Sequence, residues 1–302
     1  MNDIKQLQAY KNFILFEKRL SDHTVKSYFR DIDMLVKYNK GVSLEDLKSN
    51  NIRTSIASLH ARGLSGNSLS RILSSWKGLF IFLIDQYHYK HNPVLEIKAP
   101  KKSKKLPQTL SVDKVIKLVN ISGDDFISLR DHAILELFYS SGLRLSELVN
   151  VKLEDINFSD EIITVLGKGK KMRIVPVGKE AIQSLKKWIK IRAQLINVNS
   201  NSILFLTKQT KGLTQRAIQY RLKFWAKKQG ISENIHPHLL RHSFASHLLQ
   251  SSQDLRAVQE LLGHENISST QIYTHLDFQH LSKTYDQAHP RAKKIRSDRI
   301  FH

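Results

Sequence analysis

The sequence contains no cysteine, and this absence excludes several kinds of chemistry at once. Disulfide bonds, thiolate zinc sites and cysteine nucleophiles all depend on that side chain. The histidines are not accompanied by an H-E-x-x-H pattern or a carboxylate-rich set, so a metal site is not expected. We therefore expect a protein without a metal site.

Long apolar runs are also missing. The longest strongly apolar run, from Leu79 to Ile84, is far too short to span a bilayer. The first residues, MNDIKQLQAYKNF, lack the basic and apolar regions of a signal peptide. No amphipathic basic terminus favours attachment to a membrane surface. We expect a cytoplasmic protein, associated with the nucleoid if it binds DNA, with no membrane partner.

Acidic residues are scarce relative to basic ones. Lys and Arg total 48 against 27 Asp and Glu, which gives a formal net charge of +21 and a pI near 10.0. Neutralisation of phosphates with release of counterions would use such an excess, so a nucleic acid is the favoured partner. A solvated basic surface without a partner is the alternative.

The chain has 302 residues, which suggests two domains. Its first hundred residues show the period of amphipathic helices and little else. Ser21 and Ser43 are expected to cap the second and third helices, and LSGNS at 64–68 separates the last two. We expect residues 1–98 to form a small helical bundle. Its apolar stripes are Leu7, Tyr10 and Ile14, then Val25, Tyr28, Ile32 and Leu35, then Leu69, Ile72, Trp76, Leu79 and Leu83.

The stretch HNPVLEIKAPKKSKKLPQTLS at 91–111 differs in kind. It holds three of the six prolines, and four lysines fall within five residues. Prolines stop helices and like charges extend the chain, so this stretch predicts a linker, which we place at 99–108. A plain tether is one interpretation. A basic strap along DNA phosphates is the favoured one, with contacts from Lys101, Lys102, Lys104 and Lys105.

Residues 109–290 predict a second, mostly helical domain. Helices are expected to start at Ser111 and at Asp131, the latter ending at Gly142. EIITVLGKGKKMRIVPVG has two β-rich runs around Gly-Lys-Gly, which predicts a hairpin. Helical patterns return from Lys179, and residues 291–302 form a basic tail. The fold class is therefore mainly α, with two domains and one small antiparallel sheet.

Two basic residues stand at turns. Arg144 follows a glycine helix stop and begins a new helical pattern, where free N–H groups favour an anion and a guanidinium fork fits two phosphate oxygens. Lys168 lies between glycines at the hairpin tip and could donate a proton to a reacting atom. Each could equally be an ordinary surface residue.

HPHLLRHSFASH at 236–247 is more informative. Pro237 can start a helix, on which His238 and Arg241 then share a face. Such a pair suits a phosphate whose charge grows in a transition state. His242 and His247 point elsewhere on this helix, and we interpret them as packing or capping residues.

DLRAVQELLGHENISSTQIYTH contains a helix with the stripe Leu255, Val258 and Leu262. Gly263 should end this helix and leave His264 just beyond it. Ser268 or Ser269 then caps a short helix that carries Tyr273. A single tyrosine is usually a core residue.

Four segments occur in the order SGLRLSELV, GKGKKMRIVPV, HPHLLRHSFASHLL and LLGHENISSTQIYTH. Together they resemble the tyrosine recombinase (phage-integrase-like) family, whose members use Arg, Lys, His-x-x-Arg, His and a nucleophilic Tyr in that order. The resemblance covers nearly the whole chain and implies a SAM-like core-binding domain followed by a catalytic domain. SSQDLRAVQELLGH and YTHLDFQHLSKTYDQAHPRAK are most similar to one branch of the family. The implied catalytic residues are Arg144, Lys168, His238, Arg241, His264 and Tyr273.

This resemblance implies site-specific strand exchange on double-stranded DNA. The expected course runs through a 3′-phosphotyrosyl intermediate and a Holliday junction, and serves to resolve chromosome dimers before cell division. Expected partners are a paralogous recombinase in a cyclic heterotetramer and a cell-division DNA translocase. A DNA-binding regulator without the chemistry and a type IB topoisomerase remain alternatives.

The segment after Tyr273 is apolar at helical spacing, with Phe278, Leu281 and Tyr285. By resemblance, it would pack into a neighbouring protomer and couple the active sites. Docking within the same protomer is the alternative.

Overall fold

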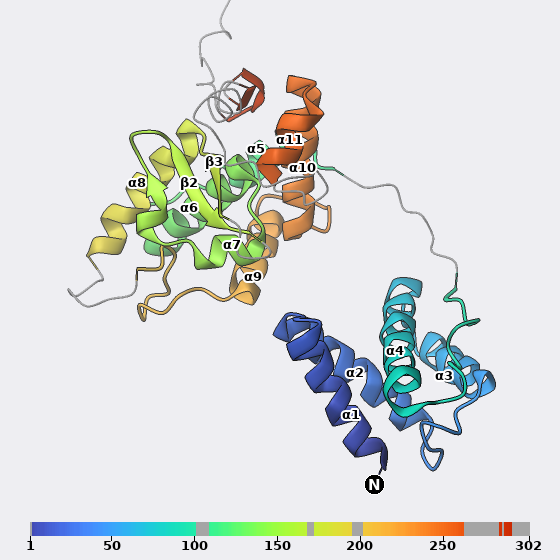
Figure 1. The fold of residues 1–302 in the computed structure, drawn as a ribbon. Coiled ribbons are helices and arrows are strands. Elements are labelled where there is room, and N and C mark those ends of the chain that lie inside the picture. Colours follow the sequence, from blue (N-terminus) through green and yellow to red (C-terminus); the bar gives the residue numbers. More distant parts are fainter. Residues whose placement is uncertain are drawn as a thin grey trace, which may run out of the picture. The chain divides into compact units, whose positions relative to one another are not determined.

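The chain forms two compact units, Met1–Leu106 and Pro107–His302, shown in Figure 1. The computed structural model describes residues 2–100, 109–167, 172–194, 202–262, 284–285 and 287–291. Within these ranges no helix is long and apolar enough to cross a membrane. The prediction of a mainly helical protein with one small antiparallel sheet is confirmed.

The first unit is a helical bundle around α4 (Gly66–Tyr87). Trp76 on α4 is fully buried, and its Nε1 donates to the backbone oxygen of Asp31 at 2.6 Å. The expected apolar stripes supply this core, which follows from their helical period. The other elements are α1 (Asn2–Asn12), the π-helical turn η1 (Phe13–Glu17), α2 (Asp22–Tyr38) and α3 (Ser49–Ala61).

Two helices of this unit were expected to begin with a serine cap, and one of them does. The Ser21 hydroxyl accepts from the backbone N–H of the first turn of α2, as predicted. Ser43 does not cap the third helix: it bonds Asp46 at 2.7 Å in a preceding turn, and α3 begins six residues later. There the side chain of Asn51 accepts from the backbone of Lys48 at 3.0 Å, so an amide in the first turn does the capping.

The segment before the lysine run belongs to the first unit. Val94 is buried in its core, and Ile97 and Ala99 pack against the same cluster. The expected linker start at residue 99 is therefore too early by at least that residue. The four candidate lysines lie within 101–108, outside the described residues.

The second unit is built around α6 (Phe126–Ser141), which packs against α5, α8 and α10. Its side chains are buried on nearly every face, with Phe138 and Tyr139 fully enclosed. A helix buried on nearly every face forms the centre of a core, and the polar side chains that α6 buries must therefore be held by partners. The surrounding elements are α5 (Val112–Val119), α7 (Leu145–Asn150), the 3₁₀ turn η2 (Leu153–Asp155), α8 (Lys179–Ala193), α9 (Gln215–Lys228), α10 (Pro237–Ser252) and α11 (Leu255–Leu262).

The predicted hairpin is confirmed as β2 (Ile162–Leu166) paired antiparallel with β3 (Met172–Pro176). A two-residue strand, β1 (Ile156–Asn157), extends it to the order β1-β2-β3 and was not anticipated. Buried and exposed positions alternate along both long strands, as expected for a sheet packed on one face. The tip at 168–171, with Lys168, lies outside the described residues.

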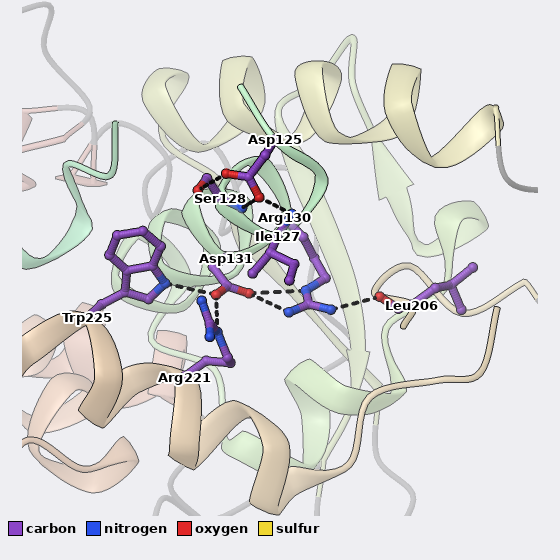
Figure 2. Close-up of polar contacts among 8 residues, drawn as sticks. All are labelled: Asp125, Ile127, Ser128, Arg130, Asp131, Leu206, Arg221 and Trp225. Atoms are coloured by element: carbon purple, nitrogen blue, oxygen red, sulfur yellow. Dashed lines mark hydrogen bonds and ion pairs between the residues drawn. The ribbon is translucent and has the colours of Figure 1, made fainter. Parts of the chain in front are cut away.

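The start of α6 differs from expectation. It begins at Phe126, and the Asp125 carboxylate caps it by accepting from the backbone N–H groups of Ile127 and Ser128. Asp131, the expected start, lies in the helix interior and is buried. Figure 2 shows why an acidic residue is stable there.

The Asp131 carboxylate is surrounded by donors. One oxygen accepts from Arg130 Nη2 at 2.8 Å, and the other accepts from Trp225 Nε1 at 2.8 Å and from Arg221 Nε (Figure 2). Arg130 Nη1 also donates to the backbone oxygen of Leu206 at 3.3 Å. The cluster therefore ties α6 to α9 and to the chain that precedes α9. The expected helix start at Asp131 is therefore wrong, because this carboxylate is used in tertiary bonds inside the helix.

The last described residues return to the core of the same unit. The Tyr285 hydroxyl bonds Ser140 at 2.7 Å, and its ring stacks on His289 with centroids 4.9 Å apart. Arg291 forms a buried ion pair with Glu136, so the expected tail cannot begin at residue 291. Tyr285 therefore packs against α6 of its own chain, whereas docking of the preceding segment in a neighbouring protomer stays a prediction. Phe278 and Leu281 lie outside the described residues.

Candidate active site

Arg144 is positioned by the tight connection between α6 and α7. Gly142 ends α6 with a φ of +54°, and a Cβ at this position would lie 2.2 Å from the Phe244 ring. Only glycine fits such a left-handed, crowded position. α7 then begins at once, with Arg144 as its N-cap residue. The predicted helix start is confirmed, and the N–H of Arg144 is already bonded within the protein.

Glu147 is the acceptor of that bond. Its Oε2 accepts from the Arg144 backbone N–H at 2.7 Å, and its Oε1 accepts from Arg144 Nη1 at 2.9 Å. Arg173 of β3 donates Nη1 and Nη2 to the same two oxygens, each at 2.8 Å. The carboxylate thus joins a buried arginine to one whose side chain remains 35% exposed.

Electrostatics agree with this geometry. Burial alone would raise the pKa of the Glu147 carboxyl group, but hydrogen bonds from Arg173 and Arg144 outweigh burial and lower the pKa to about 2. Glu147 is therefore negatively charged at neutral pH. Its charge balances part of the positive charge that gathers around it.

Arg241 comes from the first turns of α10. Pro237 occupies the first turn, as predicted, and the Nδ1 of His236 accepts from the Leu239 N–H at 3.1 Å. His238 is exposed one residue further on. Burial, together with the positive charges of Arg144 and Arg173, lowers the pKa of the Arg241 guanidinium to about 10. Arg144 and Arg173 are thus neighbouring positive charges that oppose the protonation of Arg241.

Hydrogen bonds connect Arg241 to two other elements. Its Nη1 donates to the backbone oxygen of Gly142, two residues before Arg144, and its Nη2 donates to that of Leu262 at 2.6 Å. Arg173 Nε donates to the neighbouring oxygen of Leu261 at 3.3 Å. Carbonyls at a helix C-terminus lack intrahelical partners and carry the negative end of its dipole. Two arginines therefore hold the end of α11, which Figure 1 shows beside α10.

Three of the six predicted catalytic residues lie in the described part of the chain: Arg144, His238 and Arg241. Arg241 bonds the backbone oxygen of Gly142, two residues before Arg144, so these two residues lie on segments in contact. The other three are outside the described residues, with Lys168 two residues after β2, His264 two residues after α11, and Tyr273 nine residues beyond His264. The roles of all six stay predictions.

Two residues of this cluster escaped the sequence analysis. Glu147 had a signal, because a glutamate three residues after a helix start is the pattern of a capping box. Arg173 had a weaker signal, a charged residue at an inward position of an alternating strand. Of the other helix histidines, His247 packs as predicted between the Tyr139 hydroxyl and the Leu110 carbonyl, whereas His242 is exposed.

Comparison with known families covers both units. Residues 108–280 match the Phage integrase family, and residues 7–87 match the Phage integrase N-terminal SAM-like domain. The chain therefore belongs to the phage integrase family and is a site-specific tyrosine recombinase.

Individual relatives point to one branch. Tyrosine recombinase XerC of Pseudomonas fluorescens (strain Pf0-1) is 48% identical over 299 residues, which is 97% of this chain and 99% of the relative. Tyrosine recombinase XerC of Pseudomonas aeruginosa (strain LESB58) is 47% identical over 292 residues, covering 95% of each protein. The expected resemblance to the XerC branch is confirmed.

Solved structures agree at the level of the fold. XerH site-specific recombinase bound to palindromic difH substrate is 25% identical with a TM-score of 0.69, and the match covers 87% of this chain and 79% of that one. The Tn1549 transposon integrase in complex with transposon right end DNA has a TM-score of 0.72 at 19% identity, covering 92% and 98%. The second likeness shows the fold alone.

Proposed function

We propose that this chain exchanges DNA strands at a specific site through a 3′-phosphotyrosyl intermediate. The observation that carries the proposal is that Arg241 of α10 bonds the backbone oxygen of Gly142, two residues before Arg144 at the start of α7. Two arginines on neighbouring segments suit a phosphate whose charge grows during the reaction. The segment with Tyr273 begins where Arg241 holds the end of α11.

In the proposed cleavage step, the Tyr273 oxygen attacks a DNA phosphodiester. A bond forms between this oxygen and phosphorus, and the bond to the 5′-oxygen breaks. His238 accepts or relays the phenolic proton, which is needed because tyrosine has a pKa of about 10. Lys168 gives a proton to the departing 5′-oxygen.

The remaining residues would stabilise the transition state. Arg144 and Arg241 clamp the nonbridging oxygens, and His264 donates a hydrogen bond to one of them. One phosphoester replaces another, so a 5′-hydroxyl from a second duplex can reverse the step without a nucleotide cofactor. The positive charge that a metal ion supplies in other phosphoryl-transfer sites would come from the arginines.

Exchange between two duplexes requires four strand cuts, and hence four protomers and a Holliday junction. Similarity to XerC proteins supports the finer proposal that the chain resolves chromosome dimers before cell division. Its partners would be an XerD-like paralogue in a cyclic heterotetramer and a cell-division DNA translocase. The likeness to XerH recombinase bound to its difH substrate supports double-stranded DNA as the substrate of this chain. Residues 1–98 would bind the core of the site, and the linker lysines would follow the phosphates.

Tyr273→Phe tests the nucleophile. A nicked duplex carrying the site, located by footprinting on replication-terminus DNA, should trap a covalent adduct with the unmodified protein. Tyr273→Phe should abolish the adduct and leave duplex affinity nearly intact, because only the attacking oxygen is lost. Tyr220→Phe, at an exposed tyrosine of α9, is the matched control and should keep the adduct.

Other outcomes separate the alternatives. An adduct that persists in Tyr273→Phe assigns the nucleophile to another tyrosine. Specific binding with no adduct in the unmodified protein indicates a DNA-binding regulator. Relaxation of supercoiled plasmids that lack the site, by a monomer, indicates a type IB topoisomerase.

A further inference from the structure

Arg173 occupies a position where charged side chains are rare. Inward and exposed residues alternate along β3, and Arg173 takes the inward position opposite Val165 of β2. Its exposed fraction is 6%, and Val175, the next inward residue, is fully buried. Arginine is seldom buried to this degree without partners. The strand therefore directs a charge into the protein, where specific acceptors must hold it.

The first acceptor is the carboxylate that holds Arg144. Arg173 donates two parallel bonds of 2.8 Å to Glu147, one to each oxygen. A fork of this kind fixes the orientation of both groups. The same oxygens accept from the backbone and the guanidinium of Arg144. The direction of the Arg144 side chain thus depends on a carboxylate that Arg173 orients.

The second acceptor is the end of α11. Arg173 Nε reaches the Leu261 oxygen at 3.3 Å, beside the Leu262 oxygen that Arg241 holds at 2.6 Å. These carbonyls are at the negative end of the helix dipole, where positive groups are stabilising. His264 is two residues beyond this anchored end.

Arg173 is also part of the hairpin and lies five residues after Lys168. Three segments therefore meet at one side chain: the β2–β3 hairpin, the start of α7 and the end of α11. Each segment carries or adjoins a proposed catalytic residue. We propose that Arg173 is a positioning residue for strand cleavage, which sets Arg144 through Glu147 and fixes the end of α11 through Leu261, without touching DNA. This inference rests on the proposed function.

Arg173→Lys is the primary test, carried out on the full chain. Lysine keeps the charge but has one nitrogen in place of a planar fork, so it cannot hold both carboxylate oxygens and the carbonyl together. Cleavage of the nicked duplex at saturating DNA should slow by about 10²-fold, because small misplacements of catalytic groups cost that much. Duplex affinity should change little.

A substrate change distinguishes positioning from a general loss of structure. A methylphosphonate at the scissile position removes one negative oxygen, so less charge needs stabilisation by Arg144. The stereoisomer to use is the one whose cleavage is least affected by Arg144→Ala. On this substrate, the fold-decrease in cleavage rate caused by Arg173→Lys should be much smaller than the fold-decrease on the normal phosphate. Both rates come from one preparation, so their ratio does not depend on the folded fraction.

Arg192→Lys is the matched control. Arg192 on α8 is a buried arginine that donates to the Ile203 carbonyl at 2.7 Å, away from the cluster. Its substitution should leave the cleavage rate unchanged. If Arg173→Lys does not fold, Arg173→Gln combined with Glu147→Gln removes both partners of the buried fork together and should show the same dependence on the substrate.

The outcomes separate this inference from the proposed function. If the unmodified protein forms no adduct, the proposed function fails. If it forms the adduct and the Arg173 variant cleaves at the same rate, the positioning role is refuted. Equal defects on phosphate and methylphosphonate also refute it, because they indicate damage that does not act through Arg144.

Discussion

Among the buried carboxylates of the second unit, Asp131 and Glu147 look alike in their bonding but differ in their surroundings. Asp131 accepts from Arg130, Arg221 and a tryptophan, whereas Glu147 accepts from Arg173 and Arg144. Around Asp131 the arginine side chains are 7% and 19% exposed, so the cluster is closed. Around Glu147 one is 6% and the other 35% exposed.

The difference separates a structural cluster from a candidate site. The Asp131 arginines point inward and join α6 to α9, where their charge serves packing (Figure 2). The Glu147 cluster leaves Arg144 accessible, with Arg241 nearby and the end of α11 attached. Counting ion pairs would not distinguish the two. What distinguishes them is whether the outer arginine reaches the surface beside other chemically useful groups.

Asp131→Asn should produce the largest change in stability. Asparagine keeps the shape and still accepts from Trp225, but it leaves two arginines without their buried counter-charge. Breaking a buried pair in this way costs about 3–5 kcal/mol of unfolding free energy, measured by chemical denaturation. The cleavage rate per folded molecule should not change. A loss of cleavage in fully folded protein would show that the Asp131 cluster also serves the reaction.

Arg144→Ala and Arg221→Ala form the next contrast. Removing Arg144 should slow cleavage by about 10²–10³-fold, the usual effect of losing one transition-state donor, and Glu147 keeps its fork from Arg173. Removing Arg221 should mainly destabilise the fold, because Asp131 is almost completely buried. Single-turnover cleavage and denaturation on both variants check this. Slower cleavage in folded Arg221→Ala, together with a mere loss of stability in Arg144→Ala, would contradict the assignment of the two clusters.

The sequence predicts where the helices begin and end better than it predicts which side chains bond to one another. Gly142 and Pro237 mark helix ends through local backbone chemistry, and both predictions are confirmed. Asp131 and Ser43 were misplaced, because a residue that can cap a helix can also bond elsewhere.

Residues that act through tertiary bonds were the hardest to foresee. Arg173 and Glu147 are 26 positions apart, and no local pattern predicts that they form an ion pair. Arg144 and Arg241 each had a local signal as a phosphate-binding residue, but only the resemblance assigned them to one site. The ordering of distant segments around one carboxylate depends on packing, which a single sequence does not display.

The smallest expected effect is a loss of unfolding free energy at acid pH that is caused by protonation of Glu147. Its folded-state pKa of about 2 is below the ordinary value of 4.5, so ionised Glu147 contributes stability that is fully present above pH 4.5. This contribution, about 3 kcal/mol by linkage, is lost as pH falls from 4.5 toward 2, because the unfolded chain takes up the proton first. Glu147→Gln removes the titrating group. The difference in unfolding free energy between the two proteins should therefore be constant above about pH 5.5 and shrink by more than half at about pH 3.

The matched control is Glu154→Gln, at a carboxylate that is 67% exposed in its pair with Lys152. Exposed pairs contribute little, so this variant should follow the unmodified protein through the same acid range. A pH-independent difference for Glu147→Gln would mean that its carboxylate is not held by the arginines in the folded state. Arg144 would then be oriented by something else, and the contrast with the closed Asp131 cluster would lose its physical basis.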